Sequence, residues 1–201
     1  MTVGRVKIRA GFVLLVSILV YLDRGYLLLI VFAAAALHEL GHYIPLRLLG
    51  GRVTRLELTG GGIGMTFSFY QKRKGVKTRL LNGYAREILA VLGGPAASLG
   101  FALLFSLRNG IIKEQAALAG MCLSHGVFNL LPMRGLDGGR VLELASGALG
   151  FTHARTALNV TTTLTALLLG GLCGVLALCY RDVSLLLAMI YVLSSALPKP
   201  S

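Results

Sequence analysis

Charged residues are scarce in this chain of 201 residues, since Asp, Glu, Lys and Arg together make up only 14% of it. A soluble domain usually carries about 25%, so these side chains cannot coat a globule of this size. The hydrophobic fraction of 55% also excludes a disordered chain, which is far more polar. The composition therefore indicates an integral membrane protein.

Cysteine is scarce as well. The three cysteines, Cys122, Cys173 and Cys179, all lie inside apolar runs and show no CxxC spacing. This pattern excludes a disulfide-rich scaffold and argues against a structural zinc site built from thiolates.

Long apolar runs take up most of the chain. A membrane span needs about 20 apolar residues, so the length allows about six spans and little else. We predict an all-α membrane protein with about six transmembrane helices, formed as a single domain over residues 1–201. The predicted spans cover residues 11–22, 26–49, 88–107, 116–131, 157–179 and 183–197.

The stretch 51–70 does not follow a helical pattern. Apolar residues alternate, or nearly so, on both sides of three consecutive glycines, Gly60 to Gly62. Two short strands around a glycine-rich turn fit this pattern. On the pattern alone, a surface hairpin between helices is favoured over a sheet edge that pairs with an extended peptide.

The formal net charge of +12 raises the question of a nucleic-acid partner. No recognition module is visible and the charges lie in the loops, so we expect no nucleic acid to bind. If both termini are cytoplasmic, 16 of the 20 Lys and Arg residues fall on the cytoplasmic side. The positive-inside rule then predicts a multi-pass protein of the cytoplasmic membrane.

The second predicted span contains His38-Glu39-Leu40-Gly41-His42, an HExxH motif. His38 and His42 are one helical turn apart, so both imidazoles project from one face, as two zinc ligands require. Glu39 can reach a metal-bound water as general base. The motif lies about seven residues from the cytoplasmic end of its span, or roughly 10 Å. The alternative is a packed polar cluster in a transporter, because ionisable residues in a span usually mark some function.

A catalytic zinc site usually has three protein ligands, so a third ligand is needed. Asp137 is flanked by glycines and follows the fourth span, which is broken at Pro132. Irregular backbone at membrane depth is tolerated where it lines a watery cavity or is buried in protein. We favour Asp137 as the third ligand over a simple capping role in a glycine-rich turn.

The pair of motifs, HELGH in one span and N-x-x-P-x-x-x-L-D-G-G (Asn129 to Gly139) in a later one, resembles the site-2 protease family of intramembrane zinc metalloproteases. Gly93-Gly94-Pro95 resembles a Gly-Pro segment of that family, with Ser98 standing where an Asn often follows. The resemblance covers roughly residues 10 to 155.

The resemblance implies one Zn²⁺ per chain, held by His38, His42 and Asp137. Glu39 would be the base, and Asn129 would help to position the substrate backbone. The resemblance also favours the interpretation that residues 51–70 form a membrane-edge β-hairpin that pairs with the substrate, over a simple surface hairpin. We expect neither a PDZ-like insertion nor a C-terminal regulatory domain. Within the family, this organisation is most like that of the sporulation proteases.

The function that the resemblance implies is hydrolysis of a peptide bond in or near a transmembrane segment of a membrane-tethered protein. A sigma factor or its regulator would fit as substrate, and the active site would face the cytoplasm. The resemblance leaves room for a regulatory membrane partner or a homo-oligomer. The alternative is a non-enzymatic membrane protein such as a metal carrier or transporter.

His125 is a further ionisable residue within a predicted span, four residues before Asn129 and hence on the same helix face. It could orient a metal ligand, touch a substrate carbonyl or bond a neighbouring helix. The last, structural role has about the same weight as the others together.

The charge distribution predicts the topology. Reporter tags at Lys74 and at the C-terminus should both be cytoplasmic, and a tag near Asn109 should be exterior, because the positive-inside rule places the basic loops in the cytoplasm. The side of the membrane on which each tag lies is measured by the accessibility of the tag in intact cells. A tag at Lys74 that is accessible only from outside would reverse the orientation.

Overall fold

A computed structural model describes residues 2–3, 6–8, 10, 13, 16–17, 20–21, 27–59, 62–69, 80–107 and 112–181 of the chain. The chain divides into two compact units, Met1–Phe128 and Asn129–Ser201.

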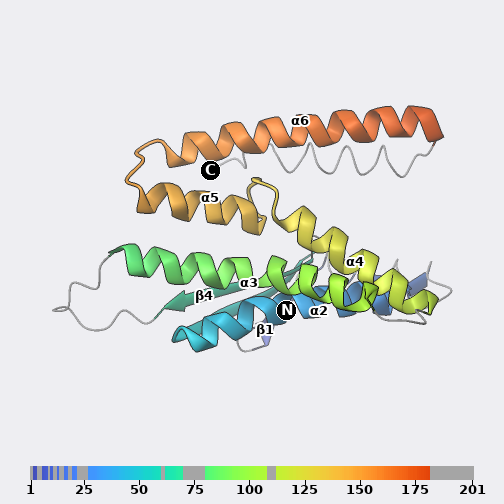
Figure 1. The fold of residues 1–201 in the computed structure, drawn as a ribbon, viewed down its shortest axis with the longest axis horizontal. Helices are drawn as coiled ribbons and strands as arrows, with labels where there is room; N and C mark the ends of the chain where they lie inside the picture. Colours follow the sequence, from blue (N-terminus) through green and yellow to red (C-terminus); the bar gives the residue numbers. More distant parts are fainter. Residues whose placement is uncertain are drawn as a thin grey trace. The chain divides into compact units, whose positions relative to one another are not determined.

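The first unit contains strands β1 (Thr2–Val3), β2 (Val6–Ile8), β3 (Gly51–Thr59) and β4 (Gly62–Phe69) and helices α2 (Leu27–Leu48), α3 (Leu80–Ser106) and α4 (Lys113–Asn129) (Figure 1). The last residue of α4, Asn129, already belongs to the second unit. The second unit contains α5 (Asp137–Ala148) and α6 (Ala154–Tyr180).

Among the residues that the structure describes, three helices are long and apolar enough to cross a membrane: Leu28–Leu48, Gly83–Ser106 and Thr156–Tyr180. They correspond to the predicted spans 26–49, 88–107 and 157–179. The predicted span 116–131 falls in α4, which is a helix of 17 residues but not one of these three. Of the predicted span 11–22 the structure describes only residues 13, 16–17 and 20–21, and the predicted span 183–197 lies wholly outside the described residues. The structure thus supports three of the six predicted spans.

Two helical segments differ from the prediction. Helix α3 begins at Leu80, before the start of the predicted span 88–107. Helix α5 lies between the predicted spans 116–131 and 157–179, where no helix was predicted. Both differences have one cause: apolar runs mark membrane-spanning segments, whereas helical hydrogen bonding also continues through polar and glycine-containing sequence.

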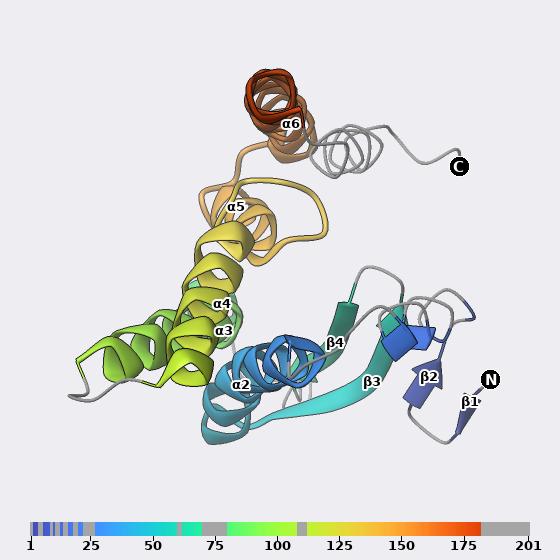
Figure 2. The ribbon, with the colours of Figure 1, turned by 90° about the vertical axis from the view of Figure 1, so that its right-hand side faces the viewer.

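The strands form one sheet in the order β1-β2-β3-β4 (Figure 2). Strand β2 runs parallel to β3, and β4 runs antiparallel to it, with Gly51 opposite Phe69 and Leu58 opposite Ile63. The predicted hairpin at 51–70 is therefore confirmed. Within the described sheet β4 is the last strand, so it has one paired side and one open side.

Glycine connects the hairpin to α2. Gly50 has φ +81°, a left-handed conformation that glycine adopts without steric cost and that commonly ends helices. Its N–H donates to the Arg47 carbonyl (3.2 Å). Strand β3 starts at the next residue, so the sheet follows α2 with no intervening loop, and α2 also packs against β3 and β4.

The core of the first unit is built from small side chains. Ala34 of α2, Ala102 of α3 and Cys122 of α4 are buried together, with Leu37, Phe101, Leu118 and Met121 packed around them. Small residues allow helix backbones to approach closely, as is common between membrane helices. Small residues also bring helices close together beside the two histidines, where the approach is even tighter.

Candidate metal centre

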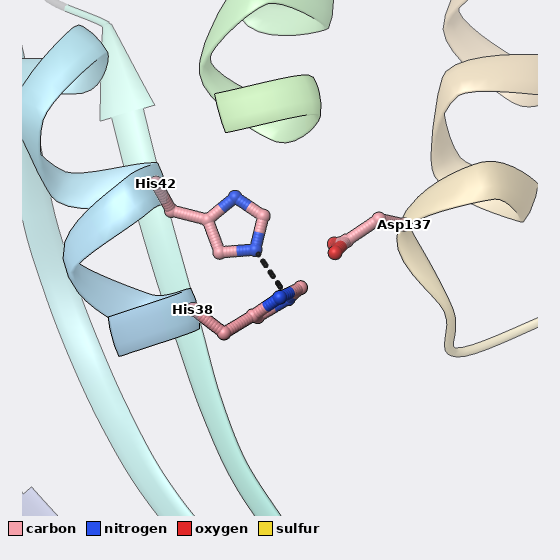
Figure 3. A group of neighbouring side chains, drawn as sticks. All are labelled: His38, His42 and Asp137. Atoms are coloured by element: carbon pink, nitrogen blue, oxygen red, sulfur yellow. Dashed lines mark hydrogen bonds between the residues drawn. The ribbon is translucent and has the colours of Figure 1, made fainter. Parts of the chain in front are cut away.

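His38 and His42 lie on one face of α2, as their four-residue spacing predicts. Both are buried, with 2% and 6% of their surface exposed. Their Nε2 atoms are 3.2 Å apart and the rings are nearly perpendicular, at 86° (Figure 3). The two nitrogens thus lie within hydrogen-bond distance of each other.

The outer ring nitrogens of both histidines have partners on α3. His42 Nδ1 is 3.0 Å from the Ala90 carbonyl oxygen, and His38 Nδ1 is 2.9 Å from Ser98 Oγ. A carbonyl oxygen can only accept, so His42 Nδ1 carries the proton and its Nε2 keeps a lone pair. The Gly94 N–H lies 3.3 Å from the same Nδ1, but it cannot donate to a protonated nitrogen, so the shorter contact with Ala90 decides the tautomer.

This geometry fits a metal ion. Zinc binds imidazole nitrogen at about 2.0–2.1 Å in tetrahedral sites, which places two such nitrogens about 3.3–3.4 Å apart. The observed 3.2 Å is close to that separation. Histidine ligands are usually oriented by a hydrogen bond from the ring nitrogen that does not bind the metal, which here is Nδ1. His38 and His42 are therefore suited to hold two coordination positions of one ion.

Three glycines allow α2 and α3 to come this close. A Cβ on Gly94 would overlap the ring of His42, and one on Gly41 would overlap the Gly93 carbonyl and Ala97. A Cβ on Gly93 would overlap the Gly41 carbonyl. That carbonyl cannot receive a helix hydrogen bond from Pro45, which has no N–H, and it faces Gly93 instead. Helix α2 continues through Pro45 to Leu48.

Glu39 follows His38 on α2 and is half-buried. Its Oε2 atom is shielded from solvent. Its position in the motif and its partial burial suit a base that acts beside the two histidines.

His125 of α4 lies against His38. The ring centroids are 4.5 Å apart and the rings meet edge to face at 83°. The contact agrees with a role in orienting the His38 ring, and a role at the substrate stays a prediction.

In the second unit, Asp137 is the first residue of α5 and is half-buried (Figure 3). Gly135, with φ +85°, and the extended Leu136 lead into it. A Cβ on Gly138 would overlap the Leu130 carbonyl, and one on Gly139 would overlap that of Met133. The two glycines thus let the preceding loop fold back onto the first turn of α5.

Helix α6 anchors this loop. The Arg134 N–H donates to Thr162 Oγ1 (3.1 Å), and that hydroxyl donates to the Leu158 carbonyl (2.6 Å). Met133 is buried with Ala166, and Leu131, Leu136 and Leu169 pack around them. The backbone that carries Asp137 is therefore fixed by polar and apolar contacts on α6.

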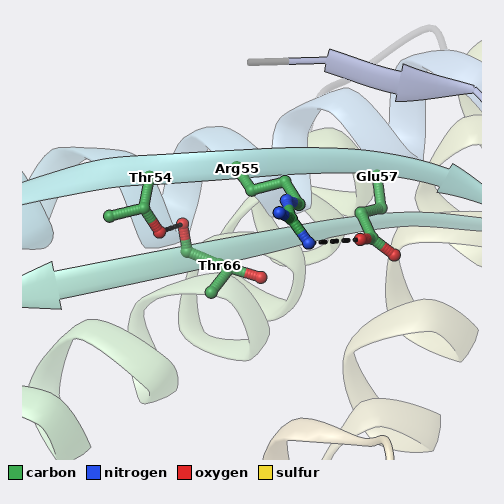
Figure 4. A network of polar contacts seen from close by, with 4 residues as sticks. All are labelled: Thr54, Arg55, Glu57 and Thr66. Atoms are coloured by element: carbon green, nitrogen blue, oxygen red, sulfur yellow. Dashed lines mark hydrogen bonds and ion pairs between the residues drawn. The ribbon is translucent and has the colours of Figure 1, made fainter. Parts of the chain in front are cut away.

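The open strand β4 is a second candidate element. The register of β3 and β4 shifts between Val53 and Arg55, so Thr54 is the extra residue of a β-bulge. Its hydroxyl donates to the Thr66 carbonyl (3.0 Å), and Arg55 pairs with Glu57 at 3.4 Å (Figure 4). The Thr54 bond secures β4 to β3 where the ladder is interrupted, and it leaves the other side of β4 open.

The structure thus brings His38, Glu39 and His42 together on α2, and it places Asp137 and Asn129 in the second unit, with Asn129 half-buried at the end of α4. Sequence reasoning gave no role to the Ala90 carbonyl, to Ser98 or to Thr162. The spacing of small residues in Gly93-Gly94-Pro95-Ala96-Ala97-Ser98 is a signal of close helix packing that could have pointed to Ser98. A backbone carbonyl leaves no such signal.

Comparison with known proteins identifies a fold. No protein-family model matches the chain, and no curated protein matches it. Among solved structures, the chain is similar to the site-2 protease from Methanocaldococcus jannaschii, with a TM-score of 0.59 and 19% identity. The match covers 98% of this chain and 91% of that chain. The chain has the site-2 protease fold.

The glycine contact at His42 gives a prediction. Gly94→Ala should greatly reduce zinc binding, because the new methyl group overlaps the His42 ring and must displace it from the Ala90 carbonyl. The matched control is Gly100→Ala in the same helix, where a Cβ meets nothing within 4 Å. It should keep its zinc and gain up to about 1 kcal/mol of stability from helix propensity. Zinc content of the purified variants is the measurement, and equal zinc in both would contradict the proposed crowding.

Proposed function

We propose that this chain is an intramembrane zinc metalloprotease that cleaves a membrane-tethered protein in or near its transmembrane segment. The observation that carries the proposal is the buried histidine pair: two Nε2 atoms 3.2 Å apart, with the outer nitrogens bonded to α3. The site-2 protease fold and the three apolar helices support the same function.

His38, His42 and Asp137 would hold the metal, since together they offer two imidazole nitrogens and one carboxylate oxygen, a donor set that zinc accepts. Three protein ligands leave one position open, which is the arrangement of catalytic rather than structural zinc sites. Bound zinc would lower the pKa of a water to about 7 and polarise the substrate carbonyl.

Glu39 would act as general base and then as general acid. It accepts the proton of the attacking water and delivers it to the nitrogen of the leaving amine, so the same carboxylate serves both steps. The shielding of its Oε2 atom from solvent limits competition from bulk water for that proton.

The substrate would bind as an extended strand along the open side of β4. A helical peptide hides its carbonyls in its own hydrogen bonds, so a transmembrane segment must unwind before it can be cleaved. Pairing with a sheet edge supplies new partners for the backbone groups that unwinding releases. We propose that Asn129 adds a side-chain hydrogen bond to the substrate backbone.

The proposed setting is the cytoplasmic membrane, with the active site open to the cytoplasm and about six spans in all. We propose an organisation like that of stage IV sporulation protein FB, and a membrane-tethered sigma factor or its regulator is the substrate class that this likeness favours. A regulatory membrane partner or a homo-oligomer would be compatible with this role.

Replacing the base tests the chemistry. Glu39→Gln should keep zinc and fold but lower cleavage of a tethered test substrate by at least about 100-fold, because an amide cannot take up the proton. Glu114→Gln on the exposed first turn of α4 is the control and should cleave normally. His42→Ala should lose zinc and activity together. Turnover close to the unmodified protein in Glu39→Gln would assign the base to another residue.

Replacing Asn129 separates substrate binding from metal binding. Asn129→Ala should reduce cleavage by roughly tenfold, the value of about one hydrogen bond to the substrate, while zinc content stays the same. Asn159→Ala on an exposed position of α6 is the matched control. If Asn129→Ala empties the metal site, Asn129 supports the ligands rather than the substrate.

A further inference from the structure

Ser98 is a fully buried polar residue that the proposed chemistry does not use. Its relative exposure is 0%, and its hydroxyl oxygen lies 2.9 Å from His38 Nδ1. It extends from α3, whereas His38 belongs to α2. A buried hydroxyl at hydrogen-bond distance from a candidate metal ligand has a direct means of influencing that ligand.

A serine hydroxyl can accept as well as donate. When its oxygen accepts the Nδ1–H of His38, the proton of the neutral ring is held at Nδ1 and the Nε2 lone pair is available to a metal. When it donates to Nδ1, the proton lies on Nε2 and blocks that atom. The partner of Nδ1 therefore decides whether His38 can bind the metal.

The two histidines differ in this respect. His42 Nδ1 faces the Ala90 carbonyl, which can only accept, so the backbone alone fixes its tautomer. His38 Nδ1 instead lies 2.9 Å from the Ser98 hydroxyl, which can accept or donate. This contact of His38 can be changed by a mutation of Ser98, whereas the carbonyl contact of His42 belongs to the backbone.

Helix α4 seals this contact. A Cβ on the buried Gly126 would come within 3.1 Å of Ser98 Cβ, which is a tight contact, so the glycine lets α4 pack closely over Ser98. His125, the preceding residue, presses edge-on against the His38 ring. With α4 in this place, water has little access to the bond between Ser98 and His38 Nδ1, and the ring has little freedom to turn away.

We propose that Ser98 is a positioning residue of the metal centre, whose hydroxyl accepts the Nδ1–H of His38 and so keeps its Nε2 directed at the bound ion. This inference rests on the proposed function, because it presupposes that the centre binds zinc. It concerns a residue that touches neither the metal nor the substrate.

The test is zinc affinity, measured by competition with a chromogenic chelator on the purified full-length protein. Ser98→Ala should weaken zinc binding by about 10- to 100-fold, the usual effect of losing such a partner, and Ser98→Thr, which keeps a hydroxyl, should restore most of it. The matched control is Ser106→Ala in the same helix, where the hydroxyl donates to the Ala102 carbonyl (2.7 Å). That variant should bind zinc as the unmodified protein does.

A second readout is the visible spectrum of Co²⁺ bound in place of zinc, which responds to a change in ligation. Ser98→Ala should alter this spectrum, whereas Ser106→Ala should not. Unchanged zinc affinity in Ser98→Ala, or equal losses in Ser98→Ala and Ser98→Thr, would overturn the role of the hydroxyl and leave the proposed protease function intact. Absence of zinc binding in the unmodified protein would overturn both.

Discussion

The close approach of α2 and α3 is the constraint on which the histidine pair depends. At Gly41, Gly93 and Gly94 there is no room for a side chain, and this lets the Ala90 carbonyl and Ser98 reach the imidazoles directly. In an apolar environment an unsatisfied polar group costs several kcal/mol, so two buried histidines need these partners. Close packing and ligand orientation are therefore one feature of the structure, because the glycines that bring the helices together also let the Ala90 carbonyl and Ser98 come within hydrogen-bond distance of the histidines.

The backbone that carries Asp137 is fixed in a different way. Its loop has few regular backbone hydrogen bonds, and it relies on the Thr162 hydroxyl, on Met133 in a small apolar cluster, and on glycines that admit the loop against α5. Threonine is well suited to this role, since its hydroxyl donates within α6 and still accepts from the Arg134 N–H. A carboxylate at the start of a helix, such as that of Asp137, also interacts favourably with the helix dipole.

Several of these features could be read from the sequence, and others could not. HELGH at helical spacing predicted that His38 and His42 share a face, and alternation around the three glycines predicted the β3–β4 hairpin, because both patterns reflect local geometry. Helix α5 was missed, since its short polar and glycine-containing sequence resembles a loop. The partners of the imidazoles were missed for another reason: Ser98 and the Ala90 carbonyl lie about 50 to 60 residues away along the chain, and only the packing of α3 on α2 brings them near. The role of Asn129 and the count of six spans stay predictions.

The direct junction between α2 and β3 links the two parts of the proposed chemistry. Gly50 ends the helix and β3 starts at Gly51, so the ligand-bearing helix and the sheet belong to one continuous segment and pack against each other. A peptide paired with β4 would then be held in a register set by the same segment that carries the proposed metal ligands His38 and His42. A flexible loop at this junction would allow the strand to shift relative to the metal, and a shift of one residue would move the paired peptide by about 3.3 Å. Such a shift would exchange one scissile bond for the next, so the glycine turn is the element that we expect to fix which bond is cleaved.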